Sequence, residues 1–184
     1  MPAERLLPLC PRVIATSKPG KGAWAREELE DALAGLPHYE VRPAGYPGVL
    51  VAYTREPPGR VAEEILSWEY AYISSIIIAG ECTRPDEVVG VVRVEIERCP
   101  RRSIDLRLKL RGPCRGLKAE IESLLRGRVR RSRRSPYGLV VECLQDLAVA
   151  GCGRAVTRPY GVRVYMLYSP VSGAPPRPSR TRSP

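Results

Sequence analysis

Aliphatic and charged residues alternate one by one along the stretch IDLRLKLR, from Ile104 to Arg111, and Gly112 ends the pattern. A period of two is typical of a β-strand, because successive side chains point to opposite faces of a sheet. One face of this strand is aliphatic and faces the core. The other face carries Asp105, Arg107, Lys109 and Arg111. We expect this charged face to be open, because its neighbouring cations repel one another unless an anion lies over them.

Hydrophobic spacing predicts the remaining elements in the same way. Strands are expected at 12–17, 49–53, 70–79, 138–144, 147–149 and 162–168. Apolar residues recur at helical spacing in 25–36, 60–68 and 117–125. The segment VVGVVRVEIER, 88–98, fits both periods, and we predict a helix there. Our reason is the preceding helix start, which has the cap residue Thr83, a proline in the first turn and two acids.

The turn at Pro57–Gly59 divides this pattern into two units of mixed α and β structure. We expect an N-terminal lobe at 1–58 and a second, larger unit at 59–168. From 169 to 184 the chain reads SPVSGAPPRPSRTRSP, which holds too little apolar surface to pack. The sequence therefore predicts an α+β fold followed by a disordered basic tail.

The positive charge of the chain is confined to one segment. Residues 101–134 hold thirteen Lys or Arg and three acids, an excess that equals the formal net charge of +10 of the whole chain. Six arginines fall between Arg126 and Arg134. An ordinary protein surface mixes both signs of charge, whereas this segment has few acids. Its cations repel one another, and a bound polyanion would relieve that repulsion. Arginine also bonds two phosphate oxygens at once.

We therefore predict nucleic-acid binding, with an acidic membrane or an acidic protein as the alternative partners. RNA is favoured over DNA, because the sequence shows no helix-turn-helix, zinc finger or leucine zipper to enter a major groove. The cations expected to contact phosphates are Arg107, Lys109, Arg111, Arg115, Lys118, Arg126, Arg128, Arg130, Arg131, Arg133 and Arg134.

Catalytic and cofactor motifs are missing from the sequence. His38 is the only histidine, and no nucleotide-binding, esterase or metalloprotease pattern is complete. The loop from Ser17 to Gly22 (SKPGKG) is interpreted as a connecting turn, with a phosphate contact as the minor alternative. We expect no cofactor and no enzymatic activity. A small RNA-modifying enzyme, or a subunit of one, is the alternative, and a structural ribonucleoprotein component is a third reading.

The cysteines are spread singly, without a C-x-x-C pair, so no metal site is expected. The six are Cys10, Cys82, Cys99, Cys114, Cys143 and Cys152. Buried free thiols are the first interpretation and disulfides the second. The chain has no Asn and a single Gln, a composition that heat adaptation or a GC-rich genome produces, and heat-adapted proteins are the exception to the reduced cytosol. No run is apolar enough to span a membrane, and we expect a cytoplasmic protein.

The order of several local patterns resembles the THUMP domain proteins, especially the stand-alone type related to the tRNA acetylation adaptor Tan1. The patterns are RVIATSKPGKGAWAREELEDAL, GVLVAY, AYISSIIIAGECTRPDEV, IDLRLKLRG, LKAEIESLL and GLVVECLQDLAVAGCG, which together cover most of 12–156.

This resemblance implies a ferredoxin-like N-terminal lobe followed by a THUMP α/β core. It also implies tRNA as the ligand and a separate modifying enzyme as the partner, such as an acetyltransferase that forms N4-acetylcytidine. The basic strand end of the family falls on Lys109, Arg111 and Gly112, where the glycine would let the backbone turn towards RNA. The turn at Pro113–Cys114 and the dense arginines after Leu125 depart from the family pattern.

Overall fold

The predicted strands join one continuous sheet in the computed structural model, which describes residues 10–100 and 102–167. Within these residues the strand order is β2-β3-β1-β4-β9-β8-β7-β5-β6. The strands are β1 (Val13–Ser17), β2 (Tyr39–Pro43), β3 (Val49–Thr54), β4 (Ile73–Ala79), β5 (Ser103–Lys109), β6 (Arg130–Arg131), β7 (Tyr137–Cys143), β8 (Ala148–Thr157) and β9 (Arg163–Leu167). The helices are α1 (Gly22–Leu33), α2 (Pro58–Ser67), α3 (Val88–Arg98) and α4 (Lys118–Leu125), with short 3-10 turns η1 (Pro85–Glu87), η2 (Gly112–Leu117) and η3 (Pro159–Gly161).

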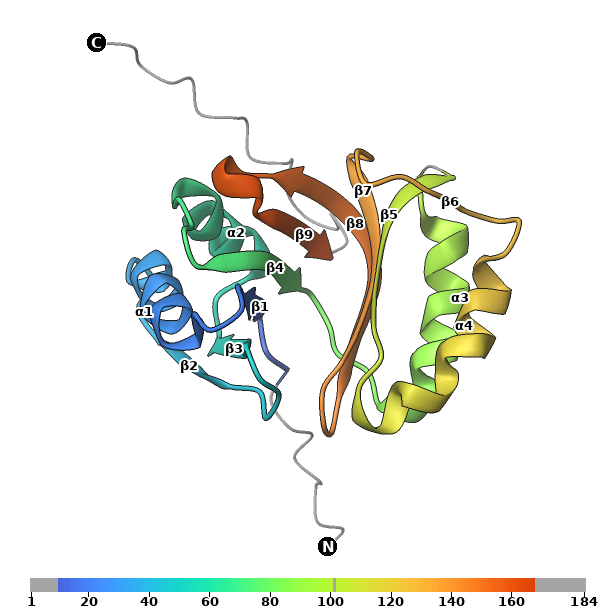
Figure 1. The fold of residues 1–184 in the computed structure, drawn as a ribbon, viewed down its shortest axis with the longest axis horizontal. Helices are drawn as coiled ribbons and strands as arrows, with labels where there is room; N and C mark the ends of the chain where they lie inside the picture. Colours follow the sequence, from blue (N-terminus) through green and yellow to red (C-terminus); the bar gives the residue numbers. More distant parts are fainter. Residues whose placement is uncertain (1–9, 101, 168–184) are drawn as a thin grey trace, which may run out of the picture.

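The first half of the chain folds as β1-α1-β2-β3-α2-β4, and its four strands pair antiparallel with one another. Helices α1 and α2 cover one face of these strands (Figure 1). Leu29 and Leu33 of α1 and Ile65 of α2 are fully buried against that face. Their spacing along each helix puts them on one stripe, which is why these segments form amphipathic helices.

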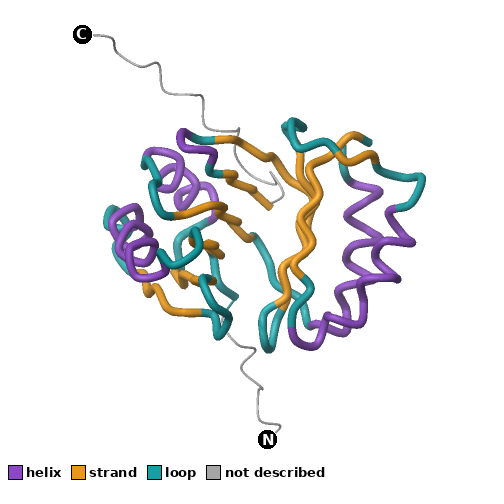
Figure 2. Tube along the Cα trace, viewed as in Figure 1, coloured by secondary structure: helices purple, strands orange, loops and turns teal. Residues whose placement is uncertain are grey.

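In the second half, α3 and α4 cover the outer face of β5, β7 and β8 (Figure 1). Val92 of α3, Ile121 of α4 and Ile104 of β5 meet in a second core. The inner face of these strands packs on the inner face of the first half, where Ile14 and Ile77 meet residues of β7 and β8. The result is four layers, helix, sheet, sheet and helix, which Figure 2 shows in a Cα trace.

Strand β8 joins the two sheet layers. Its residues from Ala148 to Arg154 pair with β7, and those from Arg154 to Thr157 pair with β9, which lies beside β4 in the first half. Gly153 permits this crossing, because a Cβ atom there would collide with the backbone carbonyl of Met166 on β9. The bend folds one sheet back on itself.

The sequence predicted most elements, and the structure differs from it at four points. The choice of a helix for 88–98 is confirmed by α3, and the strand predicted at 104–111 is confirmed by β5. Strands β2 and β6 were not predicted, and β8 is much longer than the strand expected at 147–149. The expected lobe boundary at residue 58 runs through a core, because α2 and β4 pack with β1. The predicted tail at 169–184 lies outside the described residues.

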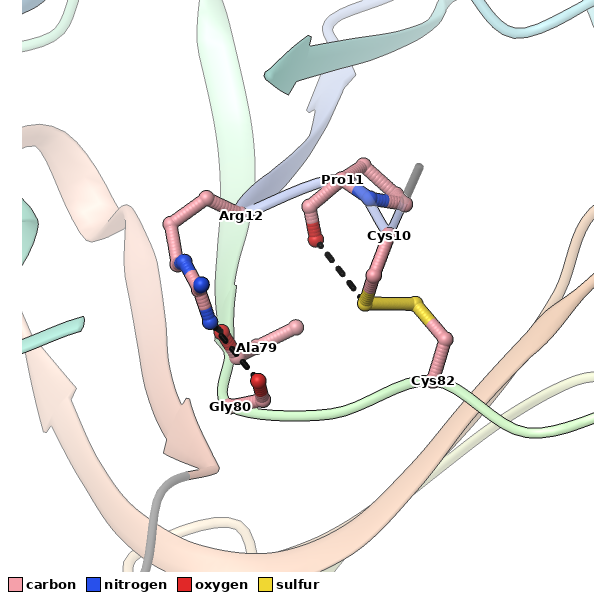
Figure 3. Close-up of a disulfide and its surroundings, with 6 residues drawn as sticks. All are labelled: Cys10, Pro11, Arg12, Ala79, Gly80 and Cys82. Atoms are coloured by element: carbon pink, nitrogen blue, oxygen red, sulfur yellow. Dashed lines mark hydrogen bonds between the residues drawn. A yellow bond between two sulfur atoms is a disulfide. The ribbon is translucent and has the colours of Figure 1, made fainter. Parts of the chain in front are cut away.

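The first interpretation of the cysteines as free thiols is wrong. All six pair, as Cys10–Cys82, Cys99–Cys152 and Cys114–Cys143, with Cα atoms 5.6, 5.6 and 6.2 Å apart. Figure 3 shows the first bridge, which joins the chain before β1 to the segment after β4. Beside it, Arg12 donates hydrogen bonds to the carbonyl oxygens of Ala79 and Gly80 at 2.9 and 2.7 Å. The pairing was not visible in the sequence because each partner is remote along the chain.

Candidate nucleic-acid interface

The charged face of β5 meets a buried carboxylate on the neighbouring strand. The register of β5 and β7 places Glu142 beside Lys109, between Arg107 and Arg111. Arg107 Nε lies 3.2 Å from Glu142 Oε2, and Arg111 donates to the other oxygen of the same carboxylate. The Glu142 side chain is 0% exposed. The expectation that this face is open is therefore wrong at Arg107 and Arg111, which have an internal acid as partner.

These charged side chains also connect the two sheet layers. Arg107 donates a second hydrogen bond, of 2.9 Å, to Thr16 Oγ1 on β1. Farther along the same face, Arg163 of β9 pairs with Asp105 at 2.8 Å, and the Tyr165 hydroxyl donates to the same oxygen of Asp105 at 3.0 Å. Buried charges that are paired and hydrogen-bonded fix the relative position of the elements that carry them. This polar layer therefore holds the two sheet layers together.

Tyr165 gives this layer a measurable pH dependence. Burial, together with the Asp105 carboxylate, raises the pKa of Tyr165 to about 12, against a usual value of about 10 in an unfolded chain. Above pH ~10 the unfolded chain loses this proton first, so this stabilisation is present below pH 10 and is lost as the pH rises to about 12. We expect the free energy of unfolding to fall more steeply across this range in the native chain than in Tyr165→Phe. Chemical unfolding at pH 10 and pH 12 measures this free energy. An equal fall in the native chain and in Tyr165→Phe would contradict the assignment.

Most of the other predicted cations are exposed. Among the described residues, none of these side chains forms an ion pair with a carboxylate: Lys109, Arg115, Lys118, Arg126, Arg130, Arg131, Arg133 and Arg134. Arg128 differs, because it pairs with exposed Glu97 at 2.7 Å. The cations predicted to contact phosphates therefore divide, within the described part of the chain, into eight exposed ones without a carboxylate partner and three arginines that are paired.

The segments that carry these exposed cations, η2 with the start of α4 and the chain around β6, lie at opposite ends of β5 (Figure 1). Lys109, with Arg115 and Lys118 in η2 and α4, lies where β5 ends. The group from Arg126 to Arg134 lies where β5 begins, since Ser103 pairs with Arg130 of β6. A strand of this length spans about 20 Å. The structure therefore places the exposed cations in two separate basic patches.

Gly112 turns the chain at the end of β5, as the sequence indicated. Its φ of +50° lies in the left-handed region that glycine tolerates best. A Cβ atom at this position would lie 2.6 Å from the Tyr46 hydroxyl of the β2–β3 turn. The Arg111 guanidinium lies 5.5 Å from the centre of the Tyr46 ring. The turn is thus fixed by contact with the first half of the chain.

Sequence reasoning missed the acid that matters most here. Glu142 interrupts the apolar run LVVEC, and a carboxylate in a buried strand requires a cation as partner, so the signal was present.

The other candidate residues of the sequence lie outside this polar layer. His38 is exposed, and Lys18 of the SKPGKG loop donates its backbone N–H to the Tyr72 carbonyl oxygen at 2.7 Å. The described residues contain no group of three His, Cys, Asp or Glu side chains able to hold a metal. None of the helices within them is long and apolar enough to cross a membrane.

Comparison with known proteins gives a likeness of fold alone. No protein-family model and no curated protein matches the chain. Among solved structures, TrmN from Thermus thermophilus is similar with a TM-score of 0.52 and 15% sequence identity. The match covers 76% of this chain and 44% of that one. The chain therefore spans less than half the length of TrmN, and the likeness supports a THUMP-like fold.

Proposed function

We propose that the chain binds tRNA through its two basic patches and presents it to a separate modification enzyme. The observation that carries this proposal is the set of eight exposed cations without carboxylate partners in the second half. The fold likeness to TrmN, a THUMP-containing tRNA methyltransferase, supports a role connected with tRNA. The resemblance of the local sequence patterns to the THUMP domain proteins points the same way.

In this proposal the cations divide into two roles. The exposed side chains at either end of β5 contact phosphates, which supplies affinity without base specificity. Arg107 and Arg111 share the single carboxylate of Glu142 and act by holding β5 and η2 in place. The Arg111 side chain is 22% exposed, so a phosphate near the end of β5 would still contact it.

The adaptor role rests on the resemblance to the stand-alone THUMP type. The antiparallel order β2-β3-β1-β4 with two helices on one face supports the ferredoxin-like arrangement that the resemblance implies. In such an adaptor the chemistry belongs to a partner, and an acetyltransferase that forms N4-acetylcytidine is the one the resemblance suggests. Adding the purified chain to such an enzyme should raise acetylation of tRNA. Methyl or sulfur transfer by the chain alone, with cofactor supplied, would contradict the adaptor role.

The tRNA proposal can be tested by removing one basic patch. We expect Arg130→Ala/Arg131→Ala/Arg133→Ala/Arg134→Ala to weaken tRNA binding about 100-fold at low salt, because several charge-assisted contacts to phosphate are lost together. Fluorescence anisotropy of labelled tRNA measures this affinity.

The chain offers a matched control for this variant. Arg26, Arg42, Arg60 and Arg84 are also exposed, but each pairs with an acid on the surface. Replacing these four with alanine removes the same net charge and should change tRNA affinity far less. Equal losses in the two quadruple variants would show that net charge alone drives binding, and would reject the patch.

A further inference from the structure

The outer edge of β5 is covered by a neighbouring strand only at its beginning. Strand β6 pairs Arg130 with Ser103 and Arg131 with Ile104, and then ends. From Asp105 to Lys109, one edge of β5 pairs with β7, and no strand within the described residues pairs with the other edge. An edge of this kind leaves backbone hydrogen-bonding groups without partners.

The hydrogen bonds to β6 and Ser132 show which residues direct their backbone to that edge. The carbonyl oxygen of Arg102 accepts from Arg130 N–H at 2.6 Å, and that of Ile104 accepts from Ser132 N–H at 2.7 Å. Alternate residues of a parallel strand direct their N–H and C=O groups to opposite neighbours. Leu106 and Leu108 therefore point their backbone groups to the open side, whereas Arg107 and Lys109 point theirs to β7.

A groove runs along this open edge beside α4. It has a volume of about 350 Å³ and is lined by Leu106, Leu108, Leu110, Lys118, Glu122 and Arg131. The three leucines are only partly buried. Lys118 and Arg131, both exposed, lie towards its two ends. Four residue steps along the strand give a length of about 13 Å, enough for an extended peptide of four or five residues.

We propose that this groove docks an extended segment of a partner protein, which adds to β5 as a further strand. The segment has apolar side chains at alternate positions, to cover the leucines, and acidic residues at its ends, to meet Lys118 and Arg131. Strand addition in a groove between a sheet edge and a helix is an established way for proteins to bind peptides, because the backbone supplies affinity and alternate side chains supply specificity. Lys118 and Arg131 belong to both the groove and the basic patches, so the docking is tested without RNA and holds or fails separately from tRNA binding.

Two other occupants fit the groove less well. RNA would place phosphates over a floor of leucines, and no aromatic side chain lines the groove to stack a base. A second copy of the chain, pairing edge to edge about a two-fold axis, would bring Arg131 of one copy beside Lys118 of the other. Like charges at both ends of such a pair would repel.

Amide hydrogen exchange tests the docking at the residues that carry it. In the free chain we expect the amides of Leu106 and Leu108 to exchange at least ~100-fold faster than those of Arg107 and Lys109, since only the latter pair with β7. The probe is a synthetic peptide, EEVTVTVEE. It should slow exchange at Leu106 and Leu108 by at least ~10-fold. A peptide with lysine in place of every glutamate should have no effect.

Variants of β5 separate strand addition from simple charge attraction. Leu108→Pro removes an edge N–H without removing a bond to β7, and should weaken peptide binding about 10-fold or more. Leu108→Val keeps that N–H and should bind nearly as well. Protected Arg107 and Lys109 amides show that the proline variant is folded. If it is not, EEVTVTVEE N-methylated at alternate amides tests the same bond in the native chain and should fail to bind.

Three results would overturn the proposal. The first is unchanged exchange at Leu106 and Leu108 with saturating peptide. The second is slowed exchange at these amides with oligouridylate but not with the peptide, which would assign the groove to RNA. The third is protection of both amides in the free chain that increases with protein concentration, which would assign it to a second copy.

Discussion

Replacing Glu142 with alanine is expected to lower the free energy of unfolding by about 3–5 kcal/mol. Its side chain is fully buried and contacts Arg107 and Arg111. Without the carboxylate, both guanidinium groups would sit between the sheet layers with no opposite charge, and a buried unpaired charge is among the most destabilising changes known. Urea unfolding followed by circular dichroism measures the loss.

A matched variant distinguishes lost pairing from lost packing. Removing all three charges together, as Glu142→Met/Arg107→Met/Arg111→Met, should destabilise the chain less than Glu142→Ala, because no charge is then left without a partner. Exposed ion pairs contribute less than about 1 kcal/mol to stability. If Glu142→Ala lowers the free energy of unfolding by no more than this, the buried ion pairs do not hold the layers together.

Reduction of the disulfides is expected to lower the thermal midpoint of unfolding strongly. The bridges join cysteines 72, 53 and 29 residues apart in sequence. Closing loops of this size restricts the unfolded chain by up to about 4 kcal/mol for each bridge in the chain-entropy account. Calorimetry with and without a phosphine reductant compares the two states directly.

The bridges can be examined one at a time by paired replacement. Cys10→Ser/Cys82→Ser opens the largest loop at positions that are only partly buried, and should lower the free energy of unfolding by up to about 4 kcal/mol. Thiol titration of the unmutated chain, unfolded without reductant, should find no free cysteine. A full complement of free thiols, or an unchanged midpoint in reductant, would show that the bridges are absent in solution.

Local patterns predicted the elements whose side chains alternate or recur cleanly. The period of two in β5 and the apolar stripes of α1 and α4 read correctly because each element buries one face. The alternation of β2 (YEVRP) is short and ends in a proline, and β8 contains Gly151 and Gly153, so neither shows a strong strand signal. Strand β6 has two residues and carries no periodicity at all.

The candidate site was predicted by composition but not by geometry. The excess of cations in 101–134 located the basic half of the chain correctly, because charge needs no knowledge of contacts. Which arginines are free depends on Glu142, 31 residues after Arg111, and on the register of β5 with β7. Such pairings form only when distant strands meet, so no local pattern could show that Arg107 and Arg111 are paired while Arg130 and Arg131 are not.

The salt dependence of tRNA binding tests the central claim most directly. Each phosphate contact contributes about 0.7–0.9 to the slope of log affinity against log salt concentration, so five to seven contacts predict a slope near −5. The variant lacking Arg130, Arg131, Arg133 and Arg134 should show a slope about 3 units shallower. A native slope near zero, or a slope that this variant leaves unchanged, would contradict tRNA binding through the exposed cations.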